Sequence, residues 1–432
     1  IESNVGVVPA CFIIAGLTLF LYACWRGHMA FARRLEQEDS TAGRMGALAL
    51  LVIGSLVSLW WYVPQTSIAD LWNDVDTYVK QTQTYSLNYE ERFASLSIEG
   101  TQTLAAKSPG TVIVVIGESA SRNYMKAFTK DYAYDDTPWQ SQQKANPDFL
   151  FFQNAYSSWS QTVPVLQRAL TEQSQYNDKE FFNSASILDV AKKSGYDTYW
   201  FSNQGRYGQY DSAITLVAKT ADHAEWTDDS YNFSDKYDET LLPYLTQVDP
   251  AKNNFIVLHI MGSHIYYNNR YPESFNKFQG EEGSSTMTSE ASYANSILYT
   301  DYILSQVFDY AKKNLNLQAM VYFSDHGENL TISHNPDVFS FDMVRIPMWI
   351  YLSPSYQSAL PGRTAALRSH GSRYFTNDML YDTICGLLNA PSERYDPGQD
   401  FTSTSYRFNR DNLTTMLGQY KLSTDPDGNP EQ

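Results

Sequence analysis

The sequence is poor in cysteine, which limits the ways in which its fold can be stabilised. Its 432 residues include three cysteines, Cys11, Cys24 and Cys385. The first two lie in an apolar region near the N-terminus, so Cys385 has no partner in the rest of the chain. A small scaffold held by disulfides is therefore excluded. An oxidising compartment is not excluded, since a domain of this size can be stable without disulfides.

Positive charge is scarce as well. Lysine and arginine number 31 against 48 acidic residues, and the net charge is -17. Within residues 1–64 the arginines and the acidic residues cancel, so the whole negative excess lies downstream. A domain this acidic repels a phosphate backbone, and we therefore expect no nucleic acid partner. The aromatic and aliphatic content is high enough to build a large core.

Two long runs at the N-terminal end contain no charged residue. Residues 5–25 and 45–63 are each long enough for a transmembrane helix, and the second includes Trp60, Trp61 and Tyr62, typical of an interfacial aromatic belt. The early arginines all lie between the two runs, so the positive-inside rule predicts a cytoplasmic loop there and an external C-terminal part. The first run lacks the basic start of a cleaved signal peptide. The alternative is a pair of buried helices in a soluble protein.

These features predict four regions. Residues 1–64 form the transmembrane helices, and residues 65–105 form juxtamembrane amphipathic helices that lie on the membrane surface. Residues 106–422 form the catalytic domain. Residues 423–432 are polar and are expected to be a disordered tail.

Beyond residue 108, short apolar runs alternate with amphipathic stretches. The candidate strands are 111–116, 149–152, 197–202, 254–260, 318–323 and 347–352, and helices such as 185–194 and 297–313 lie between them. Strands that alternate with helices are typical of parallel sheets covered by helices. We therefore predict an α/β sandwich with a mostly parallel sheet.

Two of these candidate strands run into potential metal ligands. One ends just before Asp325 and His326, and the other leads through Gly117 to Glu118. Ligands of open α/β sheets bind beyond the carboxyl ends of the strands, and Asp, Glu and His side chains suit zinc with an open coordination position. We therefore predict a metal-dependent enzyme in which Glu118, Asp325 and His326 meet. The alternative is that Asp325 and His326 cap a helix without any metal.

A metal-assisted transfer also needs a nucleophile and a group that handles protons. Hydroxyl groups near the strand ends belong to Ser119, Ser121 and the run 157–162, and the residues alone do not decide among them. His264 and His334 follow apolar strands in loop-like contexts. We treat both histidines as candidates for the same cleft.

Several motifs occur in an order that resembles a known family. They are Gly117-Glu-Ser-Ala-Ser-Arg122, Thr162 before Leu166-Gln-Arg-Ala-Leu170, Phe201-Ser-Asn-Gln204, Gly262-Ser-His264, Tyr293-Ala-Asn-Ser-Ile-Leu-Tyr-Thr-Asp301, Ser324-Asp-His-Gly-Glu328 and Tyr395-Asp-Pro-Gly-Gln-Asp400. The chain thereby resembles the phosphoethanolamine transferases of Gram-negative inner membranes, within the alkaline phosphatase and sulfatase superfamily. The resemblance covers residues 110–400 and is strongest to the branch that modifies the heptose-containing core of lipopolysaccharide.

The resemblance implies roles for the predicted site residues. Glu118, Asp325 and His326 match the zinc ligands of the family, and Thr162 matches its nucleophile, which also touches the metal. The alternative for Thr162 is the N-cap of the helix that follows it. A helix N-terminus also favours an anionic phosphoryl group, which supports the nucleophile interpretation.

The resemblance also implies residues that contact the substrates. His264 and His334 match catalytic histidines that line the transfer site and bind substrate, and Asn203 matches a contact to the donor head group. Two positions of the matched motifs, Tyr293 and Asp301, we interpret as residues that orient a helix.

The implied reaction moves phosphoethanolamine from phosphatidylethanolamine, through a covalent phospho-threonine, to a cell-envelope glycan such as lipopolysaccharide core. The implied cofactor is Zn²⁺, and the implied location is the bacterial inner membrane with the catalytic domain in the periplasm. The lipid A branch carries several disulfides, which Cys385 alone cannot form, so the sequence argues against lipid A as the acceptor. The family has more membrane spans than the two predicted here. We expect either that upstream spans are missing or that the membrane domain is abbreviated.

Three alternatives stay open. The first is phosphoglycerol transfer from phosphatidylglycerol, and the second is hydrolysis of phosphate esters by the same fold. Hydrolysis of sulfate esters is disfavoured, because the Cys/Ser-x-Pro-x-Arg motif of sulfatases is not found around Thr162. The third is a non-enzymatic module tethered to the membrane.

Overall fold

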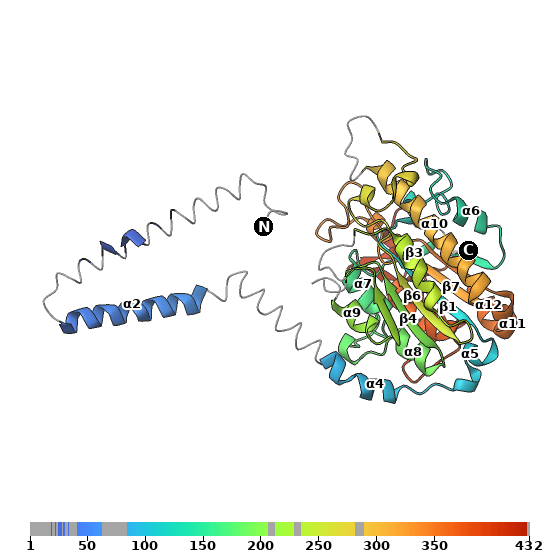
Figure 1. The fold of residues 1–432 in the computed structure, drawn as a ribbon, viewed down its shortest axis with the longest axis horizontal. Coiled ribbons are helices and arrows are strands. Elements are labelled where there is room, and N and C mark those ends of the chain that lie inside the picture. Colours follow the sequence, from blue (N-terminus) through green and yellow to red (C-terminus); the bar gives the residue numbers. More distant parts are fainter. Residues whose placement is uncertain are drawn as a thin grey trace. The chain divides into compact units, whose positions relative to one another are not determined.

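The computed structural model describes residues 19, 22, 25–27, 29–30, 33, 41–62, 84–205, 212–228, 235–280 and 289–429. The chain divides into two compact units, Ile1–Lys80 and Gln81–Gln432 (Figure 1).

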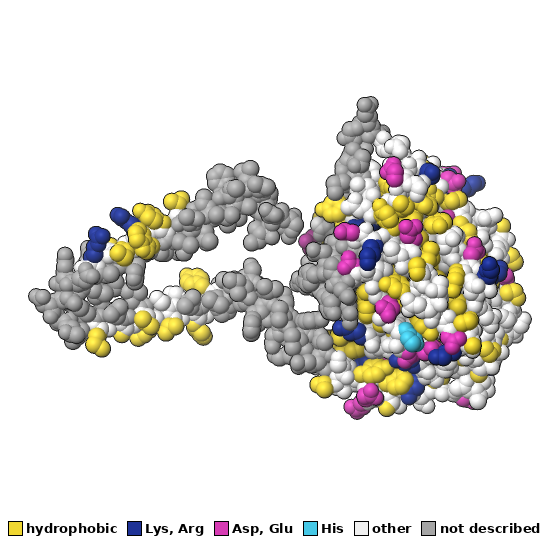
Figure 2. Space-filling model, in the orientation of Figure 1, with side chains coloured by type: hydrophobic (Ala, Val, Ile, Leu, Met, Phe, Trp, Pro, Cys, Tyr) yellow, Lys and Arg dark blue, Asp and Glu magenta, His cyan; other side chains and the backbone are white. Residues whose placement is uncertain are grey.

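In the first unit the structure describes one long helix, α2, Thr41–Tyr62. Its described apolar side chains, including Leu50, Ile53 and Trp60, are exposed (Figure 2). Across the described residues, no helix has both the length and the apolar character required to span a membrane. The predicted span 45–63 falls on α2 and the predicted span 5–25 lies mostly outside the described residues, so neither is confirmed.

The second unit is built around a seven-stranded sheet with the order β2-β8-β7-β1-β6-β4-β5. Its strands are β1 Thr111–Gly117, β2 Phe149–Phe151, β4 Asp197–Ser202, β5 His223–Trp226, β6 Asn254–His259, β7 Leu317–Ser324 and β8 Met348–Leu352. The pairs from β7 through β5 are parallel, and β8 is antiparallel to both of its neighbours. The predicted mostly parallel α/β sheet is thus confirmed.

Two small sheets flank the main one. They pair β3 Asn154–Tyr156 with β9 Tyr374–Thr376, and β10 Thr414–Thr415 with β11 Tyr420–Lys421. The helices of the unit are α4 Tyr89–Ser95, α5 Leu104–Lys107, α6 Pro138–Gln143, α7 Thr162–Ala169, α8 Ile187–Lys193, α9 Ser212–Ala218, α10 Glu290–Asn314, α11 Pro354–Ala359, α12 Pro361–Ser369 and α13 Leu380–Leu387.

The two faces of the sheet pack against different helices. Strand β1 is buried on both faces, with Val112, Val114 and Ile116 on one side and Ile113 and Val115 on the other. The first set joins a core that contains residues of α7, α8, α9 and α13, and the second joins a core that contains residues of α10. Figure 1 shows α10 on one side of the sheet and α7, α8 and α9 on the other. Continuous apolar strands of this kind are expected where helices cover both faces.

The described part of the predicted linker belongs to the second unit. Residues 84–107 contain α4 and α5, and the structure describes none of residues 63–83. Tyr85 is buried and stacks on Phe181, while the buried guanidinium of Arg92 lies 3.9 Å from a carboxylate oxygen of Asp189. The described part of this stretch therefore packs on the rest of the second unit through buried side chains. That residues 65–105 lie on a membrane surface stays a prediction.

The C-terminal end also differs from the expectation of a disordered tail. Residues 423–429 are described, and Asp425 is buried. Its carboxylate pairs with Arg345 and accepts a hydrogen bond of 2.8 Å from the hydroxyl of Tyr156. A polar segment is ordered here because its acidic side chain meets a buried cation, which local composition does not reveal.

Candidate active site

The carboxyl ends of two neighbouring strands bring the predicted metal ligands together. Strands β1 and β7 are parallel, and Gly117 is in register with Ser324. The amide of Asp325 continues the pairing and donates to the carbonyl of Gly117 across 3.0 Å. The residues that follow the two strands, Glu118 and Asp325, therefore emerge side by side at one edge of the sheet, as expected for a ligand site in this architecture.

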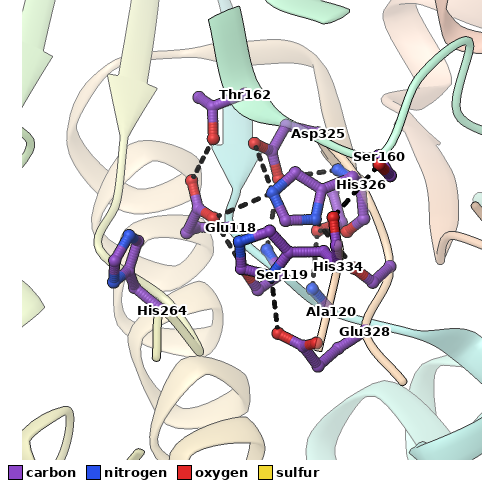
Figure 3. A network of polar contacts seen from close by, with 12 residues as sticks. Glu118, Ser119, Ala120, Ser160, Thr162, His264, Asp325, His326, Glu328 and His334 are labelled. Atoms are coloured by element: carbon purple, nitrogen blue, oxygen red, sulfur yellow. Dashed lines mark hydrogen bonds and ion pairs between the residues drawn. The ribbon is translucent and has the colours of Figure 1, made fainter. Parts of the chain in front are cut away.

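The three candidate ligands form one buried cluster (Figure 3). Nε2 of His326 lies 3.3 Å from Oε1 of Glu118 and 3.6 Å from Oδ2 of Asp325. One ligand atom from each residue lies within 4.8 Å of the others, and all three side chains are buried. The structure thus brings together the three residues that the sequence proposed from distant segments.

The hydrogen bonds of the cluster suit a cation. Nδ1 of His326 donates to the carbonyl of Gly327 across 2.7 Å, which leaves Nε2 as the nitrogen that faces the carboxylates. Oδ1 of Asp325 accepts from the amides of Ser119 and His326, whereas its buried Oδ2 makes no hydrogen bond with the described residues. Two carboxylates and one imidazole are a donor set that zinc accepts with an open position. The residues present therefore fit a zinc ion.

Electrostatics support the same conclusion. Burial alone would raise the pKa of Glu118, but the hydrogen bond and charge of His326 outweigh it and hold the pKa well below its ordinary value. Burial and the charge of Glu118 raise the pKa of Asp325 to about 8. Burial lowers the pKa of His326, but Asp325 and Glu118 together raise it to about 10. Without a metal, protons on the cluster thus offset the negative charge of its two buried carboxyl groups. A divalent cation would replace these protons and neutralise the same charge.

Among the candidate hydroxyls, Thr162 combines a contact with Glu118 and partial exposure. Its Oγ1 donates to Oε2 of Glu118 across 3.1 Å (Figure 3). Ser119 also reaches Glu118, at 2.7 Å, but it is fully buried, whereas Thr162 is partly exposed. Gln161, and not Thr162, occupies the N-cap position of α7. The N-cap interpretation of Thr162 therefore does not describe this helix, because Thr162 is its first residue and its hydroxyl points to Glu118.

Two other candidate hydroxyl groups, those of Ser157 and Ser160, bond to carbonyls of nearby loops, whereas those of Ser121 and Ser158 are buried and make no hydrogen bond with the described residues. Oγ of Ser157 lies 2.6 Å from the carbonyl of Trp159 and 2.7 Å from that of Asp325, and its single hydrogen can be donated to either one. Oγ of Ser160 donates to the carbonyl of His334 across 3.2 Å. These bonds hold the loop before α7 against the segments that carry the metal ligands. The loop thereby positions Thr162.

Two partly exposed histidines border the cluster (Figure 3). Nδ1 of His334 lies 3.0 Å from Oε2 of the buried Glu328, and the rings of His334 and His326 are 4.7 Å apart. Burial lowers the pKa of His264 to about 4, although the nearby charge of Glu118 acts in the opposite direction. His264 is therefore neutral near pH 7 and can accept a proton or a hydrogen bond.

Asn203 does not join the cluster. Its side-chain amide donates to Asp238 and to the carbonyl of Lys236, its carbonyl accepts from Thr227, and the residue is fully buried. The structure therefore gives Asn203 a role in holding loops together. Its neighbour Gln204 reaches the site, with Nε2 at 3.4 Å from Oε2 of Glu118. The sequence motif includes both residues. Which of them faces Glu118 depends on the path of the chain after β4, which the motif does not reveal.

Comparisons with known proteins agree with this geometry. The model of the family described as Sulfatase matches residues 110–390. Phosphoethanolamine transferase EptC of Escherichia coli (strain K12) is 27% identical over 322 residues, which are 70% of this chain and 55% of the relative. Phosphoethanolamine transferase CptA of Salmonella typhimurium is 28% identical over 350 residues, which are 76% of this chain and 60% of the relative. The chain thus spans little more than half the length of these curated relatives.

Solved structures show the same likeness. The C-terminal periplasmic domain of EptC from Escherichia coli, in complex with Zn, has a TM-score of 0.65 and 26% identity to this chain, and the match covers 74% of this chain and 95% of that domain. The fold is therefore that of an alkaline phosphatase-like α/β domain. Because the family model matches well over half of the sequence, the chain belongs to the sulfatase family, and the relatives described above are phosphoethanolamine transferases.

Proposed function

We propose that this chain transfers phosphoethanolamine from phosphatidylethanolamine, through a covalent ester on Thr162, to a glycan of the cell envelope. The observation that carries the proposal is the partly exposed Thr162 hydroxyl, 3.1 Å from Glu118, beside a buried cluster that suits zinc. The names of the relatives support the transferred group.

Glu118, Asp325 and His326 would hold the Zn²⁺ ion. When bound, zinc lowers the pKa of the nucleophilic hydroxyl and offsets negative charge on the phosphoryl oxygens. Within the chain, Oε2 of Glu118 already accepts the hydrogen of Thr162 Oγ1 and so orients the oxygen lone pairs toward an incoming phosphorus atom. The N-terminus of α7 favours the negative charge of the phosphoryl group at the same place.

In the first half of the reaction, Thr162 Oγ1 forms a bond to phosphorus while the bond from phosphorus to the diacylglycerol oxygen breaks. The hydroxyl proton would leave to solvent before the attack, because a bound zinc ion would lower the pKa of the threonine hydroxyl. His334 donates a proton to the leaving oxygen, and its pairing with Glu328 fixes the orientation of its ring for this task. Diacylglycerol leaves, and the phosphoethanolamine stays on the threonine.

In the second half, a hydroxyl of the acceptor attacks the same phosphorus atom and restores the Thr162 hydroxyl. His264 is the base for that step, because its lowered pKa keeps the imidazole neutral and able to take the acceptor proton. The proposed acceptor is lipopolysaccharide core. The proposed location is the inner membrane with the catalytic unit in the periplasm, next to a donor that resides in the bilayer.

The test is the covalent ester itself. The full chain would be incubated with zinc in detergent micelles that contain phosphatidylethanolamine, quenched in acid and measured by mass spectrometry, intact and after proteolysis. We expect one phosphoethanolamine on the peptide that contains Thr162, and none in Thr162→Ala. Ser158→Ala is the matched control and should keep the adduct, because its hydroxyl makes no hydrogen bond with the described residues.

The alternatives give different results in the same experiment. An adduct formed only from phosphatidylglycerol would identify a phosphoglycerol transferase. Release of the head group without any acceptor would identify a hydrolase, and the absence of an adduct with either lipid would contradict the proposal. Mass spectrometry of envelope glycans from cells with and without the gene would then identify the acceptor, and a mass gain on lipid A would contradict the core assignment.

A further inference from the structure

One residue with unusual backbone geometry contacts two of the three candidate ligands. Ser119 has φ of 56°, a left-handed conformation that residues other than glycine seldom adopt. Its amide donates to Oδ1 of Asp325 across 3.1 Å, and its hydroxyl donates to Oε1 of Glu118 across 2.7 Å. Both contacts depend on the turn after β1, so the strained conformation of Ser119 sets where the two carboxylates lie.

A tyrosine that is distant in the sequence holds this turn. The hydroxyl of Tyr293, on α10, donates to the carbonyl of Ser119 across 2.7 Å and accepts from the amide of Ser121 across 2.8 Å. Tyr293 is fully buried, so these two bonds are not exchanged for bonds with water. The two bonds hold the residues before and after Ala120 to the same hydroxyl. They thereby connect the turn to α10, the longest described helix of the unit.

We propose that Tyr293 is a positioning residue for the metal ligands, whose hydroxyl keeps Ser119 in the left-handed conformation from which it orients Glu118 and Asp325. The proposal rests on the metal-binding part of the proposed function. It does not depend on which head group or acceptor the enzyme uses. Both hydrogen bonds of the Tyr293 hydroxyl go to backbone atoms of residues 119–121, so its proposed effect on the ligand carboxylates passes through that backbone.

A simpler role for Tyr293 is packing. Its ring forms an edge-on contact with Tyr267, with centroids 5.0 Å apart, and it belongs to a small core with Ala120, Met125 and Ile297. The substitution Tyr293→Phe separates the two roles, because it keeps the ring in this core and removes both hydrogen bonds to the turn. A packing role predicts unchanged metal binding, whereas a positioning role predicts weaker binding.

The experiment measures zinc affinity of the full chain by competition with a chromophoric chelator, and ligand geometry by the absorption bands of Co²⁺ in place of zinc. We expect Tyr293→Phe to weaken zinc binding by about 10–100-fold, the usual effect of removing a group that orients metal ligands. We also expect its Co²⁺ bands to shift. Tyr299→Phe is the matched control, since Tyr299 is buried on the same helix and its hydroxyl accepts from the amide of Glu239 at 3.3 Å. Tyr299→Phe should keep a zinc affinity within about twofold of that of the unsubstituted chain, a much smaller change than the loss expected for Tyr293→Phe.

A second pair of variants tests the backbone mechanism. Glycine adopts positive φ without strain, so in Ser119→Gly the turn no longer needs the hydrogen bonds of Tyr293 to keep its conformation. The substitution also removes the hydroxyl bond to Glu118. We expect Tyr293→Phe to cost less zinc affinity in the Ser119→Gly background than in the unsubstituted chain. An equal loss in both backgrounds would overturn this mechanism, and so would unchanged zinc affinity and Co²⁺ bands in Tyr293→Phe. A chain that binds zinc but forms no ester on Thr162 would contradict the proposed function and leave the role of Tyr293 intact.

Discussion

The hydroxyl of Thr162 and the carboxylate of Glu118 meet at 3.1 Å although the two residues are 44 positions apart in the sequence. Glu118 follows strand β1, and Thr162 begins helix α7. The contact therefore depends on how α7 packs on the sheet and on how the turn after β1 is held. Substitutions that shift either element should impair zinc binding and ester formation together.

The buried charges of the metal-free cluster should make the site a source of instability. Asp325→Asn removes one of two adjacent carboxylates and keeps an oxygen for the amides of Ser119 and His326. We expect it to weaken zinc binding more than about 100-fold, since a ligand is lost outright. In chelator it should instead stabilise the chain by about 1 kcal/mol, because burial and the charge of Glu118 both disfavour the Asp325 carboxylate.

Thermal unfolding with zinc and with chelator checks this prediction. The unsubstituted chain should unfold at a higher temperature when zinc is added, since a ligand that binds the folded state alone stabilises it. Asp325→Asn should show little response to zinc. A loss of stability in chelator would show that Asp325 has a structural role which outweighs its repulsion with Glu118.

Gly262 lies directly against the backbone of Glu118. Its φ is +51°, and an added Cβ would meet the carbonyl oxygen of Glu118 at 2.9 Å and its nitrogen at 3.0 Å. Gly262→Ala therefore combines backbone strain with a clash against a metal ligand. We expect it to cost about 3 kcal/mol of stability and to weaken zinc binding. Chemical unfolding and chelator competition would measure the two effects.

Gly418→Ala separates strain from crowding. Gly418 also has positive φ, at +94°, but an added Cβ would meet nothing within 4 Å. We expect a loss of about 1 kcal/mol and unchanged zinc affinity, since only the conformational strain remains. If both alanine variants bound zinc equally well, Gly262 would not support the position of Glu118.

The C-terminal segment should contribute to stability through one buried ion pair. Asp425 is 1% exposed and pairs with Arg345, which also lies 3.1 Å from Asp427, whose side chain is 75% exposed. Asp425→Ala leaves a buried guanidinium without its main partner, which typically costs about 3–5 kcal/mol. Asp427→Ala should cost at most about 1 kcal/mol, because an exposed pair is screened by water. Urea unfolding of both variants would measure the two losses of stability. A larger loss in Asp427→Ala than in Asp425→Ala would contradict the prediction.

Asp382, on α13, should make stability depend on pH. Burial, reinforced by the charges of Asp396 and Asp400, raises its pKa from 3.8 to about 8. The folded chain thus holds this proton more tightly than the unfolded chain does. The resulting stabilisation is complete below about pH 4 and is lost as the pH rises toward 8.

Asp382→Asn isolates this effect, because the amide oxygen can still accept the 2.8 Å hydrogen bond from the amide of Asp396. As the pH rises from 6 to 8, the unsubstituted chain should lose stability relative to the variant. Urea unfolding at several pH values would measure the difference. A difference that does not change with pH would mean that Asp382 is ionised in the folded chain throughout this window.

The central strands were predictable because their signal is local. The runs that became β1, β4, β6 and β7 are apolar along their whole length, as buried parallel strands must be. The sequence missed β5, His223–Trp226, an edge strand in which half-buried and exposed residues alternate over only four positions. So short a pattern does not differ from that of a loop.

The cluster of candidate metal ligands was predictable for a related reason. The carboxyl end of a buried strand is a recurrent ligand position, so Glu118, Asp325 and His326 followed from the strands themselves. Asn203 and Gln204 show where prediction from the sequence fails, since both are polar and they are adjacent in the chain. Their roles depend on which side chain faces Glu118, and this is set by loops far away in the chain.

The sequence by itself determined the α/β class, the positions of the main strands along the chain and the three candidate ligands, because apolar runs and the residues that end them are local properties. Tertiary structure alone decided that Thr162 and not Ser119 is the accessible hydroxyl, that Tyr293 holds the turn beside Glu118, and that Asp425 is buried. These outcomes depend on side chains that are distant in sequence and come within hydrogen-bonding distance only when the helices pack on the sheet.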